Sequence, residues 1–163
     1  MKKLILVGAD PVGISLKEAV CESLKREGYE IVDVGSKEGK EVDYYDVGNV
    51  VGYLVSTKQY EKALLFCGTG MGVNIVANKH PGVYCGLCES VMTAKLCRTI
   101  NNCNVLAMGA LTTAPWKAIQ MVKVFLETPF AVDFELAESD FLKQAVEKIG
   151  QIEEELYHDC SSQ

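Results

Sequence analysis

Short apolar runs alternate along the chain with longer stretches whose apolar residues recur every three or four positions. The first run is apolar from Leu4 to Val7 and ends at Gly8, and the stretch from Ile14 to Leu24 then has helical spacing. These patterns predict one strand followed by one helix. The same alternation predicts four further strands, at 30–34, 62–66, 83–87 and 104–108, and four further helices, at 44–56, 71–78, 90–99 and 115–127.

The predicted strands are apolar throughout rather than alternately apolar and polar, which is typical of a parallel sheet covered by helices on both faces. Five strand–helix units predict a Rossmann-like three-layer α/β sandwich with a five-stranded parallel sheet, which we expect to fill residues 1–129. Residues 130–163 are more charged and predict a C-terminal helical extension. We expect its apolar stripe to pack on a second subunit. The stripe consists of Phe134, Phe141, Val146, Ile149 and Ile152.

Length and composition fit one folded domain. The chain has 163 residues, of which 48% are hydrophobic and 23% charged, enough apolar surface for a single core. The formal net charge of -6, with Arg26 and Arg98 as the only arginines, argues against a nucleic-acid partner. The apolar stretch from Leu4 to Val7 is too short for a signal peptide or a membrane span, so we expect a cytoplasmic protein without a membrane partner.

The cysteines and histidines give few indications of chemistry by themselves. The seven cysteines are an odd number spread through apolar segments, so we expect reduced thiols. Cys85 and Cys88 have the spacing of half a zinc ribbon or of a redox pair, but no second pair follows, and core packing is favoured for both. His80 and His158 are expected at the surface.

Ligands of open parallel sheets bind beyond the carboxyl ends of the strands, and three segments are candidates: Gly8–Gly13, Cys67–Gly72 and Arg98–Asn104. In the second segment a thiol at a strand end precedes three glycines and the start of a helix. This pattern combines a base or nucleophile with exposed N–H groups that bind an anion. The alternative is that Cys67 is a small buried hydrophobic residue.

Neither glycine-rich segment completes a dinucleotide-binding fingerprint, because Val73 stands where the last glycine of the second segment would fall and the first segment lacks its middle glycine. We therefore expect no nicotinamide cofactor. Asp10, at the end of the first strand, is positioned to accept a hydrogen bond from a sugar hydroxyl or to cap the helix that begins near Gly13.

Several short motifs together resemble the ribose-5-phosphate isomerase type B and galactose-6-phosphate isomerase family over roughly residues 2–130. They are Gly8-Ala9-Asp10 with Gly13, Asp43-Tyr44, Cys67-Gly-Thr-Gly-Met-Gly72, Ala77-Asn78-Lys79, Pro81-Gly82, Asn101-Asn-Cys-Asn-Val-Leu106 and Met108-Gly109. The resemblance implies an aldose–ketose isomerase of sugar phosphates that works without a metal or other cofactor. It also implies a homodimer or homotetramer with active sites at the subunit interface.

The resemblance further implies a role for each matching residue. Cys67 is the proton carrier, and the Thr69 hydroxyl contacts the ring or carbonyl oxygen of the substrate. The remaining implied residues are the loop that forms the anion hole, Gly68, Gly70, Met71 and Gly72, and three residues that hold hydroxyls or order the site, Asp10, Tyr44 and Asn101.

The chain departs from the family where the sugar ring and the phosphate are handled. Pro11 and Ile100 replace two histidines, Leu111 replaces an arginine, and the acidic region Val132–Glu135 stands where further arginines are expected. The basic residues that remain to hold a phosphate are Arg98, Lys79 and Lys95.

These departures favour a substrate other than ribose 5-phosphate. A four-carbon ketose phosphate cannot close to a stable ring and needs no ring-opening histidine, so we expect such a tetrulose phosphate, or another pentose or hexose phosphate. Two alternatives remain. One is a non-catalytic or partner-dependent subunit of a galactose-6-phosphate-type isomerase, and the other is a sugar-phosphate-binding sensor.

Overall fold

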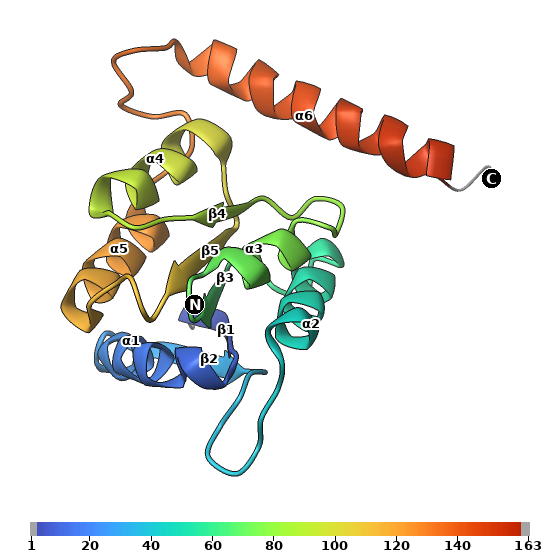
Figure 1. The fold of residues 1–163 in the computed structure, drawn as a ribbon. Helices are drawn as coiled ribbons and strands as arrows, with labels where there is room; N and C mark the ends of the chain where they lie inside the picture. The colour runs from blue at the N-terminus through green and yellow to red at the C-terminus, as the bar shows by residue number, and fades with distance from the viewer. Residues whose placement is uncertain (1–2, 161–163) are drawn as a thin grey trace.

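A computed structural model describes residues 3–160, except for the side chains of residues 158–160. Five strands form one sheet in the order β2-β1-β3-β5-β4, and every neighbouring pair is parallel (Figure 1). The strands are β1 (Lys3–Ala9), β2 (Tyr29–Asp33), β3 (Ala63–Cys67), β4 (Cys85–Leu87) and β5 (Val105–Gly109). The helices are the 3-10 turn η1 (Pro11–Gly13), α1 (Ile14–Arg26), α2 (Tyr44–Ser56), α3 (Met71–Ala77), α4 (Val91–Asn101), α5 (Pro115–Glu127) and α6 (Ser139–Cys160).

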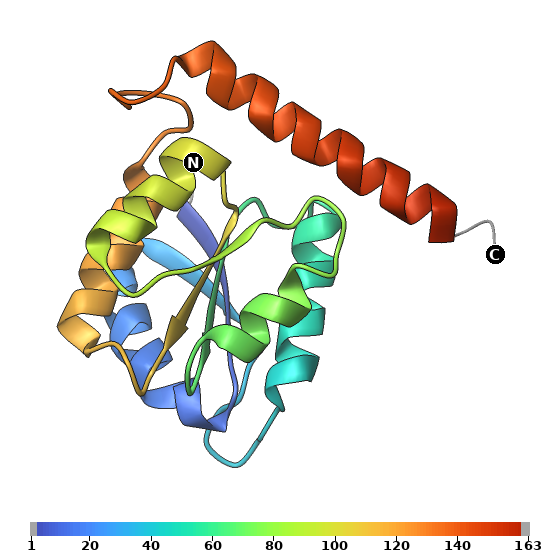
Figure 2. The same cartoon turned by 45° about the horizontal axis from the view of Figure 1, so that its top comes forward.

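Helices cover both faces of the sheet, because the central strands bury apolar side chains on both sides. Every residue of β3 and β5 is buried. Helices α1, α4 and α5 pack on one face, and α2 and α3 pack on the other (Figure 2). The predicted three-layer sandwich with a five-stranded parallel sheet is therefore confirmed.

Strand β4 is shorter than the predicted strand at 83–87. The backbone N–H of Tyr84 donates to the side-chain Oδ1 of Asn104 at 2.9 Å, so a side chain takes the place of a ladder partner and the strand begins only at Cys85. Cys85 and Cys88 are buried in the cores of opposite faces, in agreement with core packing. His80 is half-buried, with Nε2 2.9 Å from Asn49 Oδ1, so its predicted surface position holds only in part.

A buried lysine fastens α1 to the end of β2. Lys17 is only 2% exposed, and its Nζ donates to Asp33 Oδ2 at 2.8 Å and to the carbonyl oxygen of Ser36 at 2.6 Å. The apolar pattern did not predict the burial of Lys17, because its partners are the last residue of β2, Asp33, and the backbone of Ser36 just beyond it. The pair fixes the strand end that leads toward α2.

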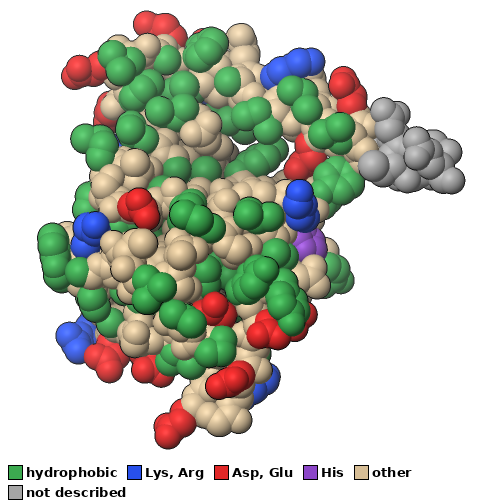
Figure 3. All heavy atoms as spheres, viewed as in Figure 1, with side chains coloured by type: hydrophobic (Ala, Val, Ile, Leu, Met, Phe, Trp, Pro, Cys, Tyr) green, Lys and Arg blue, Asp and Glu red, His purple; other side chains and the backbone are tan. Residues whose placement is uncertain are grey.

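Helix α6 extends along one side of the molecule and contacts it at few points (Figure 2). Glu153 Oε2 accepts from the Gly82 N–H at 2.7 Å, and the Tyr157 hydroxyl donates to the Lys79 carbonyl. The predicted stripe is largely open to solvent, since Phe141 is 62% exposed. Figure 3 shows hydrophobic side chains along α6 and on the neighbouring surface, with a hollow between them.

Residue 129 falls between α5 and α6, and the domain division there stays a prediction. The side chains of His158 and Cys160 lie outside the described part of the structure. Within the described residues, we find no helix with both the length and the apolar character needed to cross a membrane.

Candidate active site

The ends of β1 and β3 bring two of the candidate segments together. These strands are neighbours at the centre of the sheet, and the Asp10 N–H, just after β1, donates to the Phe66 carbonyl of β3 at 3.1 Å. Gly13 packs so closely on β3 that a Cβ there would lie 2.7 Å from the carbonyl carbon of Phe66. The chain leaves β1 toward β2 and returns to β3, so this is the switch point of the sheet, where ligands of open α/β sheets bind.

Cys67 ends β3 and lies inside a turn whose shape depends on glycine. Its Sγ accepts a hydrogen bond from the Gly70 N–H at 3.0 Å, and the residue is 5% exposed. Gly70 has φ +78°, and a Cβ there would lie 2.6 Å from Leu87 Cδ1 and 2.9 Å from the carbonyl carbon of Met108. Only glycine fits this position, and it turns the loop so that an amide points at the sulfur.

The same loop offers hydrogen-bond donors for an anion. Within the described residues, the N–H groups of Gly68 and Thr69 have no acceptor. The N–H of Met71 donates to Thr69 Oγ1 at 3.3 Å, so the Thr69 hydroxyl keeps its own hydrogen for another partner. Successive amides in a glycine-rich turn form a concave anion-binding surface.

Tyr44 and Asp10 border this loop. The Tyr44 ring lies against Gly72, where a Cβ would come within 2.6 Å of Tyr44 Cδ2, and the tyrosine is 45% exposed. Asp10 Oδ1 accepts from the Gly13 N–H at 2.8 Å, so the capping interaction considered from the sequence is present. Its second carboxylate oxygen has no partner among the described residues and is available to a ligand.

Comparison with known proteins identifies the family of this chain. Residues 5–139 match the family model described as Ribose/Galactose Isomerase. The chain belongs to the ribose/galactose isomerase family. The family resemblance noted in the sequence is thus confirmed, and the protein is an isomerase.

Named relatives and solved structures are similar over almost the whole isomerase. The 4-deoxy-4-sulfo-D-erythrose isomerase of Clostridium sp. (strain MSTE9) is 39% identical over 154 residues, which cover 94% of this chain and 97% of that relative. The D-erythrulose-4-phosphate isomerase of Pectobacterium atrosepticum is 30% identical over 155 residues, with 94% and 97% covered. The ribose-5-phosphate isomerase B of Clostridium thermocellum superposes with a TM-score of 0.84 at 32% identity, covering 94% of this chain and 99% of that one.

Two apolar residues border the Cys67–Gly72 loop of this isomerase. A Cβ at Gly68 would lie 3.4 Å from Val12 Cγ1 and 3.5 Å from Leu111 Cδ1. The N–H of Leu111 also donates to the Gly68 carbonyl at 2.9 Å, which ties the segment after β5 to the loop. Sequence reasoning singled out Leu111 only as a departure from the family and missed Val12, whose only signal was its place between Pro11 and Gly13.

The third candidate segment, Arg98–Asn104, lies at the opposite edge of the sheet. It precedes β5 instead of following a strand, because α4 runs back from the carboxyl ends to the amino ends of the strands (Figure 1). The prediction that residues 98–104 lie at the carboxyl ends of the strands, where ligands bind, is therefore wrong within a single chain. The isomerase fold brings Asp10, Tyr44 and the Cys67 loop together, and it leaves Arg98 and Asn101 apart from them.

One nitrogen of the Arg98 guanidinium is bonded within its own chain. It is 8% exposed, and its Nη1 donates to Asn102 Oδ1 at 2.9 Å and to the Cys103 carbonyl at 2.6 Å. The two lysines considered as phosphate ligands, Lys79 and Lys95, are exposed, on the turn after α3 and on α4.

Proposed function

We propose that this isomerase interconverts the aldose and ketose forms of a short-chain sugar with a terminal oxyanion. Cys67, as the thiolate, takes a proton from the carbon next to the carbonyl, and the electron pair moves onto the carbonyl oxygen to give an enediolate. Return of the proton to the former carbonyl carbon, together with transfer of the hydroxyl proton from the neighbouring oxygen to the former carbonyl oxygen, completes the isomerisation. The observation that carries the proposal is the sulfur of Cys67 at a strand end, inside a loop with unpaired backbone N–H groups.

The loop stabilises the negative charge that develops on the substrate. The N–H groups of Gly68 and Thr69 donate to the enediolate oxygen, and the Thr69 hydroxyl donates through the hydrogen that Met71 leaves unused. The free oxygen of Asp10 accepts from a substrate hydroxyl, and Tyr44 closes the side of the site next to Gly72. The cofactor-free reaction expected from the family resemblance stays a prediction.

The substrate that we propose has four carbons and ends in a sulfonate or a phosphate. Two of the relatives are named for four-carbon substrates, one of each kind. The sulfonate is favoured because neither arginine of the same chain lies beside the Cys67 loop: Arg26 pairs with Glu22 at the end of α1, and Arg98 is buried at the other edge, where its Nη1 is bonded to Asn102 and the Cys103 carbonyl. A sulfonate carries one negative charge and a phosphate ester closer to two near pH 7, so amide donors flanked by Val12 and Leu111 suit the sulfonate better.

We also propose that a second copy of the chain completes the site. Asn101, the residue expected to hold a substrate hydroxyl, is the exposed last residue of α4 and lies at the opposite edge from Cys67 of the same chain. Phe141, Ile152 and Leu156 leave an apolar side of α6 uncovered within one chain. A homo-oligomer that covers this side and presents Asn101 to the neighbouring Cys67 accounts for both features.

Proton NMR in deuterated water tests the reaction. The panel contains 4-deoxy-4-sulfo-erythrose, erythrulose 4-phosphate, ribose 5-phosphate and the free tetroses. We expect deuterium at the carbon next to the carbonyl, together with aldose–ketose conversion, fastest for a four-carbon compound with a terminal oxyanion. The Cys67→Ser variant should lose about 10²–10⁴-fold in rate, whereas Cys21→Ala, a buried thiol of α1, should not.

The other outcomes point to different functions. Full exchange in Cys67→Ser would refute the cysteine base. No exchange with any compound, combined with binding of one of them, would favour the sensor or the partner-dependent subunit.

A further inference from the structure

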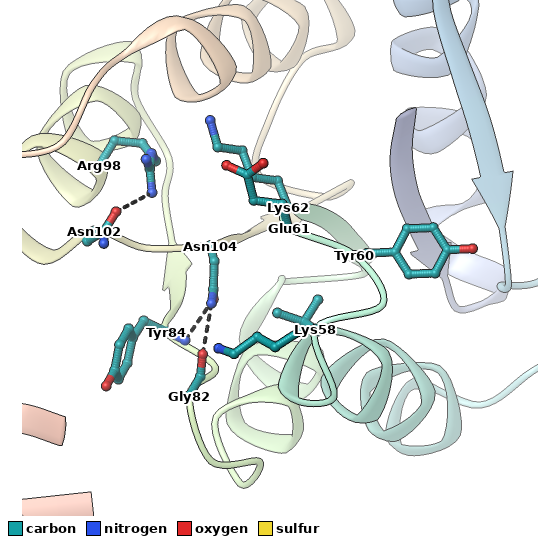
Figure 4. A pocket seen from close by; sticks show the side chains of 10 residues that line it. Lys58, Tyr60, Glu61, Lys62, Gly82, Tyr84, Arg98, Asn102 and Asn104 are labelled. Carbon is teal, nitrogen blue, oxygen red and sulfur yellow. Dashed lines mark hydrogen bonds between the residues drawn. The ribbon is translucent and has the colours of Figure 1, made fainter. Parts of the chain in front are cut away.

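A cavity lies near the amino ends of the strands, whereas Cys67 lies at their carboxyl ends. Figure 4 shows the side chains that line this cavity. Its volume is about 460 Å³, within the range of small-molecule sites. The turn after α2, the residues before β3, the loop before β4 and the end of α4 contribute its walls. None of the residues assigned to the isomerase reaction lines it.

Three cations from different parts of the chain line this cavity: Lys58, Lys62 and Arg98. Glu61 is the one carboxylate among its lining residues, and Glu153 approaches from α6, where it accepts from the Gly82 N–H. Among the side chains that the structure describes, none of the three cations has a carboxylate within 4.0 Å. The cavity is thus locally basic in a protein with a net charge of -6.

Two of these cations, Lys62 and Arg98, face each other, and the single lining carboxylate, Glu61, offsets only part of their combined charge. Lys62 donates from Nζ to the Leu126 carbonyl at 3.1 Å, and burial together with the charge of Arg98 lowers the pKa of Lys62. Figure 4 shows both side chains in the same part of the cavity, with Lys58 beside Gly82 on the other side of Asn104. An anion between these groups would relieve their mutual repulsion.

The unpaired Nε of Arg98 gives a second indication that the cavity binds an anion. The residue is more than nine-tenths buried, and its Nε has no hydrogen-bond partner among the described residues. Asn102 accepts from Arg98 through Oδ1, which leaves its side-chain amide hydrogens for a ligand. Asn104 is fixed across the cavity by bonds to the Tyr84 N–H and the Gly82 carbonyl, at 2.9 and 2.8 Å. The walls are therefore ordered, while cationic and amide donors remain unpaired.

We propose that this cavity binds a phosphate group, as inorganic phosphate or as a small phosphate monoester, at a site separate from the Cys67 loop of the same chain. Three cations and an amide donor match a tetrahedral dianion, and the volume leaves space for a small organic substituent. The proposal does not depend on the reaction assigned to Cys67.

Titration of the ¹⁵N-labelled protein with inorganic phosphate, followed by two-dimensional amide NMR, tests the site. We expect saturable shifts at the amides of Gly82, Asn102 and Asn104, and the same shifts in the Cys67→Ser variant. A parallel titration with glycerol phosphate distinguishes inorganic phosphate from a phosphate monoester as the ligand. Tighter binding of the ester identifies a phosphorylated metabolite, and equal binding identifies free phosphate.

Variants that neutralise either a cation or the neighbouring carboxylate of the cavity provide the control. Lys58→Gln, at an exposed position, should weaken binding about five-fold, and Lys62→Gln about ten-fold, because each removes one cation. Glu61→Gln should tighten binding, and Lys123→Gln on α5 should leave it unchanged. Shifts confined to residues 68–72, or equal affinities in Lys58→Gln, Glu61→Gln and the unmodified protein, would overturn the proposal.

Discussion

Gly70 holds the Cys67 turn in a conformation that another residue cannot adopt. Its φ of +78° costs a residue with a Cβ about 1–2 kcal/mol, and the contact of 2.9 Å with the Met108 backbone adds about 1–3 kcal/mol of overpacking. We therefore predict that Gly70→Ala lowers the free energy of unfolding by about 2–5 kcal/mol and lowers kcat/KM by at least ~10²-fold, since the amide turns away from the sulfur. Urea unfolding and initial rates measure the two effects.

Gly39 is the matched control for this prediction. It has nearly the same φ, +76°, but no atom lies within 4 Å of the position of its Cβ. Gly39→Ala should therefore cost only about 1–2 kcal/mol and leave kcat/KM unchanged. Equal effects of the two substitutions would mean that crowding at Gly70 has no part in shaping the turn.

Leu111 is predicted to set the preference for the terminal group of the substrate. It is 74% exposed beside the Cys67–Gly72 loop, so a longer cationic side chain fits there without disturbing the core. Leu111→Arg should raise kcat/KM for the four-carbon phosphate relative to the sulfonate about ten-fold, because a guanidinium pairs more strongly with a dianion. Leu111→Met keeps the size without the charge and should leave the ratio of the two substrates unchanged. A ratio that does not move in the arginine variant would contradict this role.

At the residue scale, the sequence located the parts of the site that follow strands. Asp10 and Cys67 come directly after apolar runs, and parallel strands present their carboxyl ends at one edge, so their proximity could be expected. Val12 could not be found in this way, because its contact with Gly68 depends on how η1 packs on β3. Arg98 was misplaced because its basic charge, rather than its position before β5, guided its assignment.

The attachment of α1 to the end of β2 depends on one side chain, that of Lys17. Removal of the Lys17 ammonium leaves the Ser36 carbonyl without this donor and Asp33 without its closest cation, so that Asp33 keeps only the Gly35 N–H at 3.0 Å and Lys37 at 3.9 Å. We predict that Lys17→Ala lowers the free energy of unfolding by about 3 kcal/mol, near the lower limit for broken buried pairs because Asp33 is 20% exposed. Lys25→Ala, an exposed lysine of the same helix, should change it by less than about 0.5 kcal/mol. Denaturant titration compares the variants, and equal stabilities would show that the buried pair contributes nothing.

Most elements could be predicted because the central strands β3 and β5 are apolar at every position and the helices show regular spacing. Pro115, expected in the first turn of its helix, indeed begins α5. The shortened β4 could not be foreseen, because it results from a side chain, Asn104, that bonds the backbone of Tyr84 from a distant part of the sequence. The C-terminal helix was expected. Its apolar stripe predicts that the helix packs against another surface, but the pattern does not identify that surface.

In the whole molecule, the residues of the proposed site lie at opposite ends of the strands. Cys67 and its loop lie at the carboxyl ends of the strands, and Asn101 lies at the amino ends. One chain cannot bring them together without unfolding α4. Two chains related by a twofold axis can, because each contributes the edge that the other lacks.

Mixed oligomers test this arrangement. Cys67→Ser and Asn101→Ala are each expected to be inactive or severely impaired as pure proteins. When the two are unfolded together and refolded in equal amounts, half of the dimers contain one chain of each kind, and one of the two sites in such a dimer has both residues intact. We predict recovery of about a quarter of the unmodified activity, with light scattering confirming the oligomeric state. A mixture that stays as inactive as its components would show that Cys67 and Asn101 do not act in one shared site. A mixture of Cys67→Ser with Thr69→Ala is the control, because Thr69 and Cys67 belong to the same loop: each mixed dimer then has two damaged sites, and no activity should return.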